Sequence, residues 1–158
     1  MRDLTELGIF YRGKVIERKP ATLIDIAEFE KKHGVKLPTD YISFVSKMNG
    51  GTPTLNWLET KGKEAFELEA FYHLSGDDTD YYSVSRASKA PSEALGRTVV
   101  AIAGDGSGDE LILDPTAASA KVKWWRHDTR DEPELVAESF ADLLDKLVKS
   151  PYSDESDT

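Results

Sequence analysis

Residues 22–51, TLIDIAEFEKKHGVKLPTDYISFVSKMNGG, predict two short amphipathic helices joined by a sharp elbow. Thr22 and Asp25 have the spacing of a capping box at the start of the first helix. Gly34 provides the left-handed residue that commonly ends a helix. The apolar residues expected to face the core are Leu23, Ile26 and Ala27, flanked by Ile24 and Phe29.

The second helix is expected to begin at Pro38, because a proline in the first turn loses no helical hydrogen bond. Its apolar residues recur at i, i+3, i+4 and i+7, which is the spacing of one helix face. Residues 49–51, Asn-Gly-Gly, are expected to end it, because glycine readily adopts positive φ. The core residues of this helix are predicted to be Tyr41, Phe44, Val45 and Met48.

Glu30 interrupts the apolar stripe of the first helix. A carboxylate that faces a core needs a partner, since burying an unpaired charge is costly. The structural interpretation is a hydrogen bond to backbone N–H groups near the start of the second helix. The functional alternative is a catalytic acid, but no catalytic motif pairs Glu30 with a histidine or a second carboxylate.

Four short motifs lie in order along this stretch: Phe29-Glu30, His33-Gly34, Leu37-Pro38-x-Asp40-Tyr41 and Asn49-Gly50-Gly51. A second block reads Ile102-Ala103-x-Asp105-Gly-x-Gly108-Asp109, with Leu113-Asp114-Pro115 after it. In this order the chain resembles the SUKH superfamily, which includes yeast cell-wall-synthesis regulators of the Smi–Knr type and many bacterial immunity proteins. The resemblance covers most of residues 22–148. It implies structural roles for Glu30, Leu37, Pro38, Tyr41, Asn49, Gly50 and Gly51.

Length and composition favour one domain. The chain has 158 residues, 39% of them hydrophobic, and no cysteine, which excludes disulfides and thiolate metal sites. We expect a single SUKH-like domain over residues 1–149, with a loosely attached segment at 1–21 and a disordered acidic tail at 150–158. No apolar run is long enough for a membrane span, and the N-terminus lacks an adequate signal-peptide core. A cytoplasmic location is therefore expected.

The remaining pattern predicts an α+β fold, a mostly antiparallel β-sheet of about four to six strands with helices packed on it. The segment from Phe66 to Leu74 alternates between apolar and polar residues, which is typical of a half-buried strand. Trp124 and Trp125 are expected on opposite faces of one strand, so that one would face outward unless covered. Further strands are expected at 54–59, 99–103, 111–113 and 122–126, helices at 79–88 and 140–148, and a charged loop at 128–138.

Candidate chemistry centres on the loop from Asp105 to Glu110. The loop resembles a calcium site, but the glycine and glutamate that an EF-hand requires are missing, so no metal is predicted. A Gly-rich hairpin with Asp-stabilised turns is the structural reading. A small hydrolase using Asp105, Asp109 and a histidine remains an alternative function.

The formal net charge of −9 disfavours a binder of the nucleic-acid backbone and favours a basic partner. With the resemblance, this predicts a cofactor-free, non-enzymatic immunity protein that binds and neutralises a basic, possibly nuclease, toxin. The alternative is a regulatory scaffold of the Smi–Knr type. The residues predicted to bind the partner are Glu67, Glu69, Asp77, Asp78, Asp80, Asp105, Asp109, Glu110 and Trp125.

Overall fold

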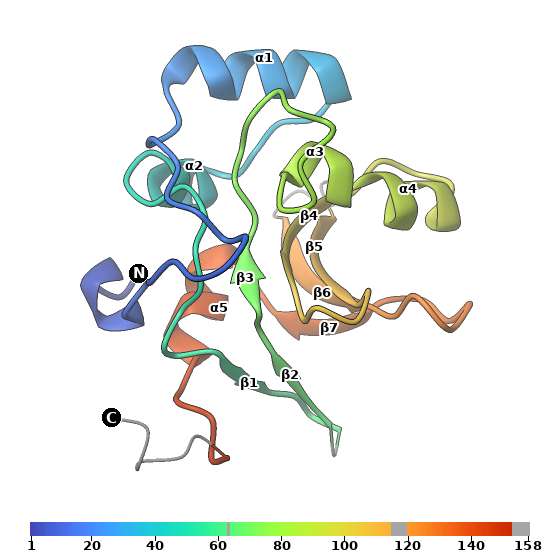
Figure 1. Cartoon of the computed structure of the whole chain (residues 1–158). Coiled ribbons are helices and arrows are strands. Elements are labelled where there is room, and N and C mark those ends of the chain that lie inside the picture. Colours follow the sequence, from blue (N-terminus) through green and yellow to red (C-terminus); the bar gives the residue numbers. More distant parts are fainter. Residues whose placement is uncertain (63, 115–119, 153–158) are drawn as a thin grey trace.

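The computed structural model describes residues 1–62, 64–114 and 120–152 and has an α+β architecture (Figure 1). A five-stranded antiparallel sheet has the order β3-β4-β5-β6-β7, and β1 and β2 form a separate antiparallel pair. The predicted fold class is confirmed. The elements are η1 (Leu4–Leu7), α1 (Leu23–His33), α2 (Thr39–Val45), β1 (Trp57–Glu59), β2 (Ala65–Glu67), β3 (Ala70–Phe71), α3 (Val84–Ala87), α4 (Lys89–Leu95), β4 (Val100–Gly104), β5 (Glu110–Asp114), β6 (Lys121–Trp125), β7 (Glu134–Ala137) and α5 (Phe140–Lys146).

Helix α1 begins and ends as predicted but buries a narrower face. Both hydrogen bonds of the Thr22–Asp25 capping box form, and Gly34 ends the helix at φ 64°. Ile26 and Phe29 are buried. The predicted stripe is wrong at Leu23, Ile24 and Ala27, which are exposed, because α1 lies at one end of the molecule and touches it along one side only (Figure 1).

Helix α2 buries Tyr41, Phe44 and Val45 as predicted, but it ends at Val45, so the predicted extension to Met48 is wrong. The rings of Tyr41 and Phe44 lie 5.1 Å and 5.0 Å from the ring of Phe140 on α5. Phe44 also contacts Phe71 of β3 at 5.0 Å, so these rings join both helices to the sheet. The structural reading of Glu30 is confirmed, because its carboxylate accepts a 2.8 Å hydrogen bond from the Leu37 N–H at the elbow.

The Asn-Gly-Gly segment after α2 is hydrogen-bonded to the strand that continues from β3. The buried Asn49 amide donates to the carbonyls of Lys19 and Leu74 at 3.1 Å and accepts the Leu74 N–H at 2.7 Å. Gly51 exchanges backbone hydrogen bonds with Phe71. A side chain at Gly51 would clash, since its Cβ would lie 2.5 Å from Ile9 Cγ2 at a φ of +114°.

The strand predicted from Phe66 to Leu74 is two strands in two sheets. The chain bends between β2 and β3, so both Phe71 and His73 are buried and the alternation ends. The exposed position predicted for His73 is therefore wrong. The helix predicted at 79–88 is also wrong in extent, because Ser83 caps the short α3 and α4 follows it.

Strand β6 carries both tryptophans, and both are buried. Trp124 packs edge-on against Phe66 at 5.1 Å and lies under the Arg126 guanidinium at 3.9 Å. Trp125 is 7% exposed, so the structure contradicts the expected outward-facing tryptophan. Part of the loop predicted at 128–138 is strand β7, which pairs with β6 and covers its far edge.

The first twenty residues are tied to the domain more firmly than predicted. Leu7 is fully buried, and the Arg2 guanidinium donates to the carbonyls of Leu144 and Leu147 at the end of α5. At the other terminus, Ser150 is buried and Tyr152 packs against Trp57. The rest of the predicted tail, residues 153–158, lies outside the described residues.

Asn49→Ala should lower the free energy of unfolding by about 3 kcal/mol, because it leaves buried backbone groups of Lys19 and Leu74 without a partner. Chemical denaturation followed by circular dichroism measures this change. Asn56→Ala is the matched control, since the Asn56 amide makes one long 3.4 Å contact, to Glu67. A loss below about 1 kcal/mol for Asn49→Ala would contradict the assignment.

Candidate protein-binding surface

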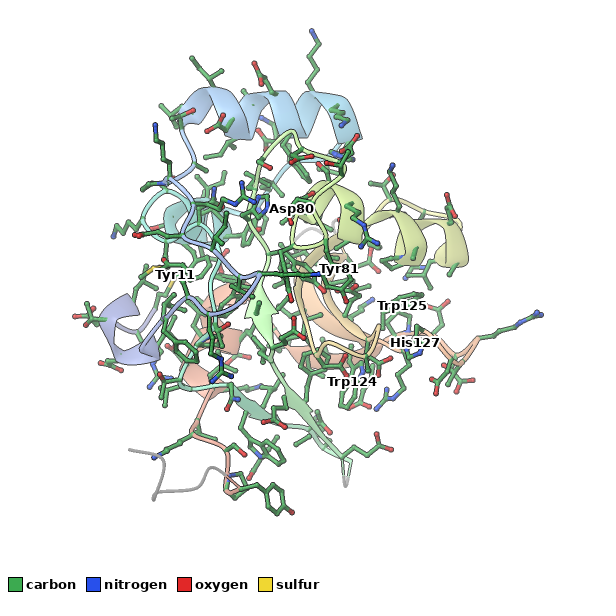
Figure 2. The ribbon with its side chains drawn as sticks, in the orientation of Figure 1. Tyr11, Asp80, Tyr81, Trp124, Trp125 and His127 are labelled. Carbon is green, nitrogen blue, oxygen red and sulfur yellow. The ribbon has the colours of Figure 1, made fainter. Side chains whose placement is uncertain are left out.

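Three carboxylates and two tyrosines from distant parts of the chain gather beside the turn between β4 and β5. We call this group the acid–tyrosine surface. Tyr81 lies near that turn, on the same side of the molecule as His127 (Figure 2). The members of the surface are Glu69, Tyr81, Tyr82, Asp105 and Glu110.

The pairing of β3 with β4 brings Glu69 to the turn. Ala70 is opposite Gly104, and the Glu69 N–H donates to the Gly104 carbonyl at 2.8 Å. The Glu69 carboxylate then lies against Gly106, where a Cβ would be 2.1 Å from Oε2. Gly106 also has a φ of +85°, so this close approach requires glycine.

The two tyrosines lie beside these acids, on the side of α3. The Tyr82 hydroxyl donates to Glu69, and burial together with this bond raises the pKa of Tyr82 to about 12. The Tyr81 ring meets the Tyr82 ring edge-on at 4.9 Å. The Arg86 guanidinium lies 4.8 Å from the centre of the Tyr81 ring, which is 45% exposed. Tyr81 therefore presents an aromatic surface to solvent next to the carboxylates.

Glu110, at the start of β5, is the most perturbed acid of the surface. Burial, reinforced by the nearby charges of Asp105 and Asp109, raises its pKa to about 8. The Tyr72 hydroxyl and the Arg86 guanidinium oppose this shift. Glu110 is therefore mostly protonated at pH 7.

Asp105 shapes the turn itself. Its Oδ1 accepts hydrogen bonds from the backbone N–H and the hydroxyl of Ser107, both at 2.8 Å. This confirms the structural reading of the loop as an Asp-stabilised turn.

Asp109 and His127 form a pair at the edge of the surface. Asp109 accepts from the Trp124 indole at 3.0 Å and lies 2.6 Å from the His127 Nδ1. The hydrogen bond to Asp109 raises the pKa of His127. Burial acts to raise the pKa of Asp109, but the hydrogen bonds from His127 and Trp124 together lower it below its ordinary value. Ser107 gives its hydroxyl to Asp105, and across residues 1–62, 64–114 and 120–152 no hydroxyl is hydrogen-bonded to His127. Of the residues in the hydrolase alternative, Asp109 is therefore in contact with a histidine, whereas Asp105 is bonded within its own turn.

One group of side chains in the described ranges could hold a metal ion, namely Asp109, His127 and Asp128, whose ligand atoms lie within 4.8 Å of one another. Both Asp109 oxygens already accept hydrogen bonds from Trp124 and His127. A metal ion bound by Asp109 would have to displace these hydrogen bonds. The absence of a metal site remains a prediction.

Three other predicted acids form hydrogen bonds or ion pairs of their own outside the acid–tyrosine surface or at its border. Asp80 accepts from Arg18, from the His73 Nε2 at 3.0 Å and from the Tyr82 N–H, and so anchors the loop that carries the tyrosines. Asp78 is bonded to Lys32 of α1 at 2.8 Å, and Asp77 closes a turn onto Thr79.

A broad groove of about 830 Å³ adjoins the acid–tyrosine surface. The N-terminal segment, including Arg12 and Lys14, forms one wall. The predicted site residues Glu67, Glu69 and Asp105 line it together with Tyr82. Sequence patterns did not assign the two tyrosines to the site, since nothing in their spacing shows that they face Glu69.

Glu110→Gln should flatten the pH dependence of stability. The folded state holds a proton on Glu110 that the unfolded chain releases above its ordinary pKa of about 4.5. This contribution to stability is therefore present at low pH and is lost as pH rises to about 8. As the pH rises from 4 to 9, the free energy of unfolding of Glu110→Gln should therefore increase by about 2 to 4 kcal/mol relative to that of wild type. Urea denaturation across this range measures it. Glu67→Gln, at an exposed position, is the control and should follow the wild-type profile of stability against pH. If Glu110→Gln also ran parallel to wild type, the raised pKa of Glu110 would be contradicted.

Asp109→Asn should lower the pKa of His127 toward about 6.5. In the wild type this pair stabilises the folded state below that pH, and the contribution is lost as pH rises through the raised pKa of His127. An NMR titration of the histidine ring protons measures both midpoints. His33, whose pKa is lowered by burial, is the internal control and should not move. An unchanged His127 midpoint would show that Asp109 does not control it.

No helix in the described part of the chain is long and apolar enough to cross a membrane. The chain is 26% identical over 147 residues to the SPbeta prophage-derived uncharacterized protein YokK of Bacillus subtilis (strain 168), an alignment covering 80% of this chain and 74% of that protein. The model of the SMI1 / KNR4 family (SUKH-1) matches residues 20–146, which include α1, α2 and strands β1 to β7. The predicted resemblance is confirmed, and this chain belongs to the SMI1 / KNR4 family (SUKH-1).

Proposed function

We propose that this protein is an immunity protein, which binds a basic bacterial toxin in the cytoplasm through the acid–tyrosine surface and neutralises it without a reaction of its own. The observation that carries the proposal is the convergence of Glu69, Asp105 and Glu110 with the exposed ring of Tyr81. Membership of the SUKH-1 family fits this role.

Charge supports a basic partner. The chain carries 29 acidic and 20 basic side chains. At the acid–tyrosine surface, Glu69, Asp105 and Glu110 lie beside one cation that acts on Tyr81 and Glu110, namely Arg86, while Arg12, Lys14 and Lys149 line the adjoining groove. Such a surface accelerates encounter with a positively charged protein and disfavours acidic ones.

The hydrogen bonds of the surface support tight rather than merely steered binding. Glu69 is held by Tyr82, and Asp105 by its own turn, so neither loses much side-chain freedom when a partner docks. Tyr81 adds apolar area with few rotatable bonds, a combination enriched among the residues that dominate binding energy.

The double variant Glu69→Gln/Asp105→Asn should weaken toxin binding about tenfold, because it removes two charges while keeping both hydrogen-bond acceptors. Calorimetric titration with the purified product of a neighbouring toxin gene measures the affinity. Affinity for the wild type should also fall as salt rises from 0.05 to 0.5 M, a range in which the screening length shortens to a few ångströms.

The matched control is Glu28→Gln/Glu93→Gln, which removes the same charge at exposed positions on α1 and α4. It should bind like the wild type. An equal loss of affinity in both double variants would show that the toxin responds to the overall charge of the protein and not to this surface. Absence of binding by the wild type would refute the proposed function.

A further inference from the structure

Strand β2 has a free edge. It pairs with β1 on one side, and no strand of the described residues pairs with its other side. The hydrogen bonds of β1 show which backbone groups face that edge. The Trp57 N–H and carbonyl both bond to Val148, so they point away from β2.

In an antiparallel pair, opposite residues either exchange both hydrogen bonds or exchange none. Trp57 is opposite Glu67, so the N–H and carbonyl of Glu67 must point away from β1. Ala65 lies two residues along the strand and is oriented in the same way. These four backbone groups have no hydrogen-bond partner among residues 1–62, 64–114 and 120–152.

The space beside this edge is open on both faces. Ala65 and Glu67 line the groove of about 830 Å³ that also reaches Asp105. On the other face, Glu64 and Trp124 line a separate hollow of about 300 Å³. The outer edge strand of the large sheet is protected differently, because β7 has a register shift against β6 and Lys146 covers the Val136 carbonyl.

The charges of the residues around the edge indicate which kind of strand could pair with it. Residues 64–69 read Glu-Ala-Phe-Glu-Leu-Glu, so an antiparallel second copy would bring like charges together across the new ladder. A strand rich in lysine or arginine would instead place opposite charges next to Glu67 and Glu69.

We infer that the free edge of β2 accepts an extended, basic segment of the partner as an added strand. This inference rests on the proposed function and specifies how the partner is held. Main-chain hydrogen bonds supply affinity in such strand addition, and alternate side chains supply specificity.

The register of the added strand follows from the free groups. Partner residues opposite Ala65 and Glu67 would each exchange two hydrogen bonds with β2. Their side chains would point to the groove, on the same face as Glu67. The partner residue between them would face the hollow beside Trp124, since Phe66 already meets the Trp124 ring on that face.

The test uses the isotope-labelled full chain and the synthetic peptide Lys-Val-Lys-Val-Lys-Val-Lys-Val, with hydrogen exchange read by NMR. Saturating peptide should slow exchange at the Ala65 and Glu67 amides about tenfold, whereas a Lys-Pro repeat of equal charge should not, because it lacks alternate N–H groups. Ala65→Pro should abolish peptide binding while the β1 ladder stays intact, because this proline replaces an outward N–H. Ala65→Ser is the matched control, and denaturation curves establish that both variants fold.

Equal effects of the two peptides, or no slowing at Ala65 and Glu67, would overturn the inference. A third result would also overturn the inference: Ala65→Pro binds the toxin as tightly as wild type, and Glu69→Gln/Asp105→Asn binds it weakly. In that case the proposed function would still stand. Strand addition by the peptide without any binding of toxin would uphold the free edge as a docking site and refute the toxin as its partner.

Discussion

The buried amide of Asn49 joins the helical pair to the sheet. It satisfies three backbone groups on two segments, one before α1 and one after β3. Water cannot replace it without opening the core, because Asn49 is only 7% exposed. The glycines that follow let the chain lie against the strand, where any side chain at Gly51 would strike Ile9. A short polar segment thus fixes the helical pair to the sheet.

That attachment also positions the acid–tyrosine surface. The strand held by Asn49 carries Glu69 at its start and His73 near its end. His73 and Arg18 both bond to Asp80, which fixes the loop bearing Tyr81 and Tyr82. The acids of the surface come from the bend before β3 and from the β4–β5 turn, so folding the large sheet and assembling the surface are one event.

The surface tolerates its own charge by two means. Glu69 and Asp105 are stabilised by hydrogen bonds from neighbouring hydroxyl and N–H groups, which offset the cost of placing acids together. Glu110 avoids the cost by keeping its proton at neutral pH. A basic partner would supply the missing opposite charge. The free edge of β2 beside it provides backbone hydrogen bonds that need no side-chain match.

The helix boundaries at Thr22 and Gly34, the family, the α+β class and the role of Glu30 could all be predicted from the sequence, because capping, turn formation and apolar spacing act over a few residues. The exposed face of α1, the division of the strand after Phe66, the burial of both tryptophans and the grouping of the acids could not be predicted in this way. These outcomes depend on contacts between residues tens of positions apart. Asp78 and Asp80 look like Glu69 in the sequence, but Lys32 and Arg18 pair with them in space.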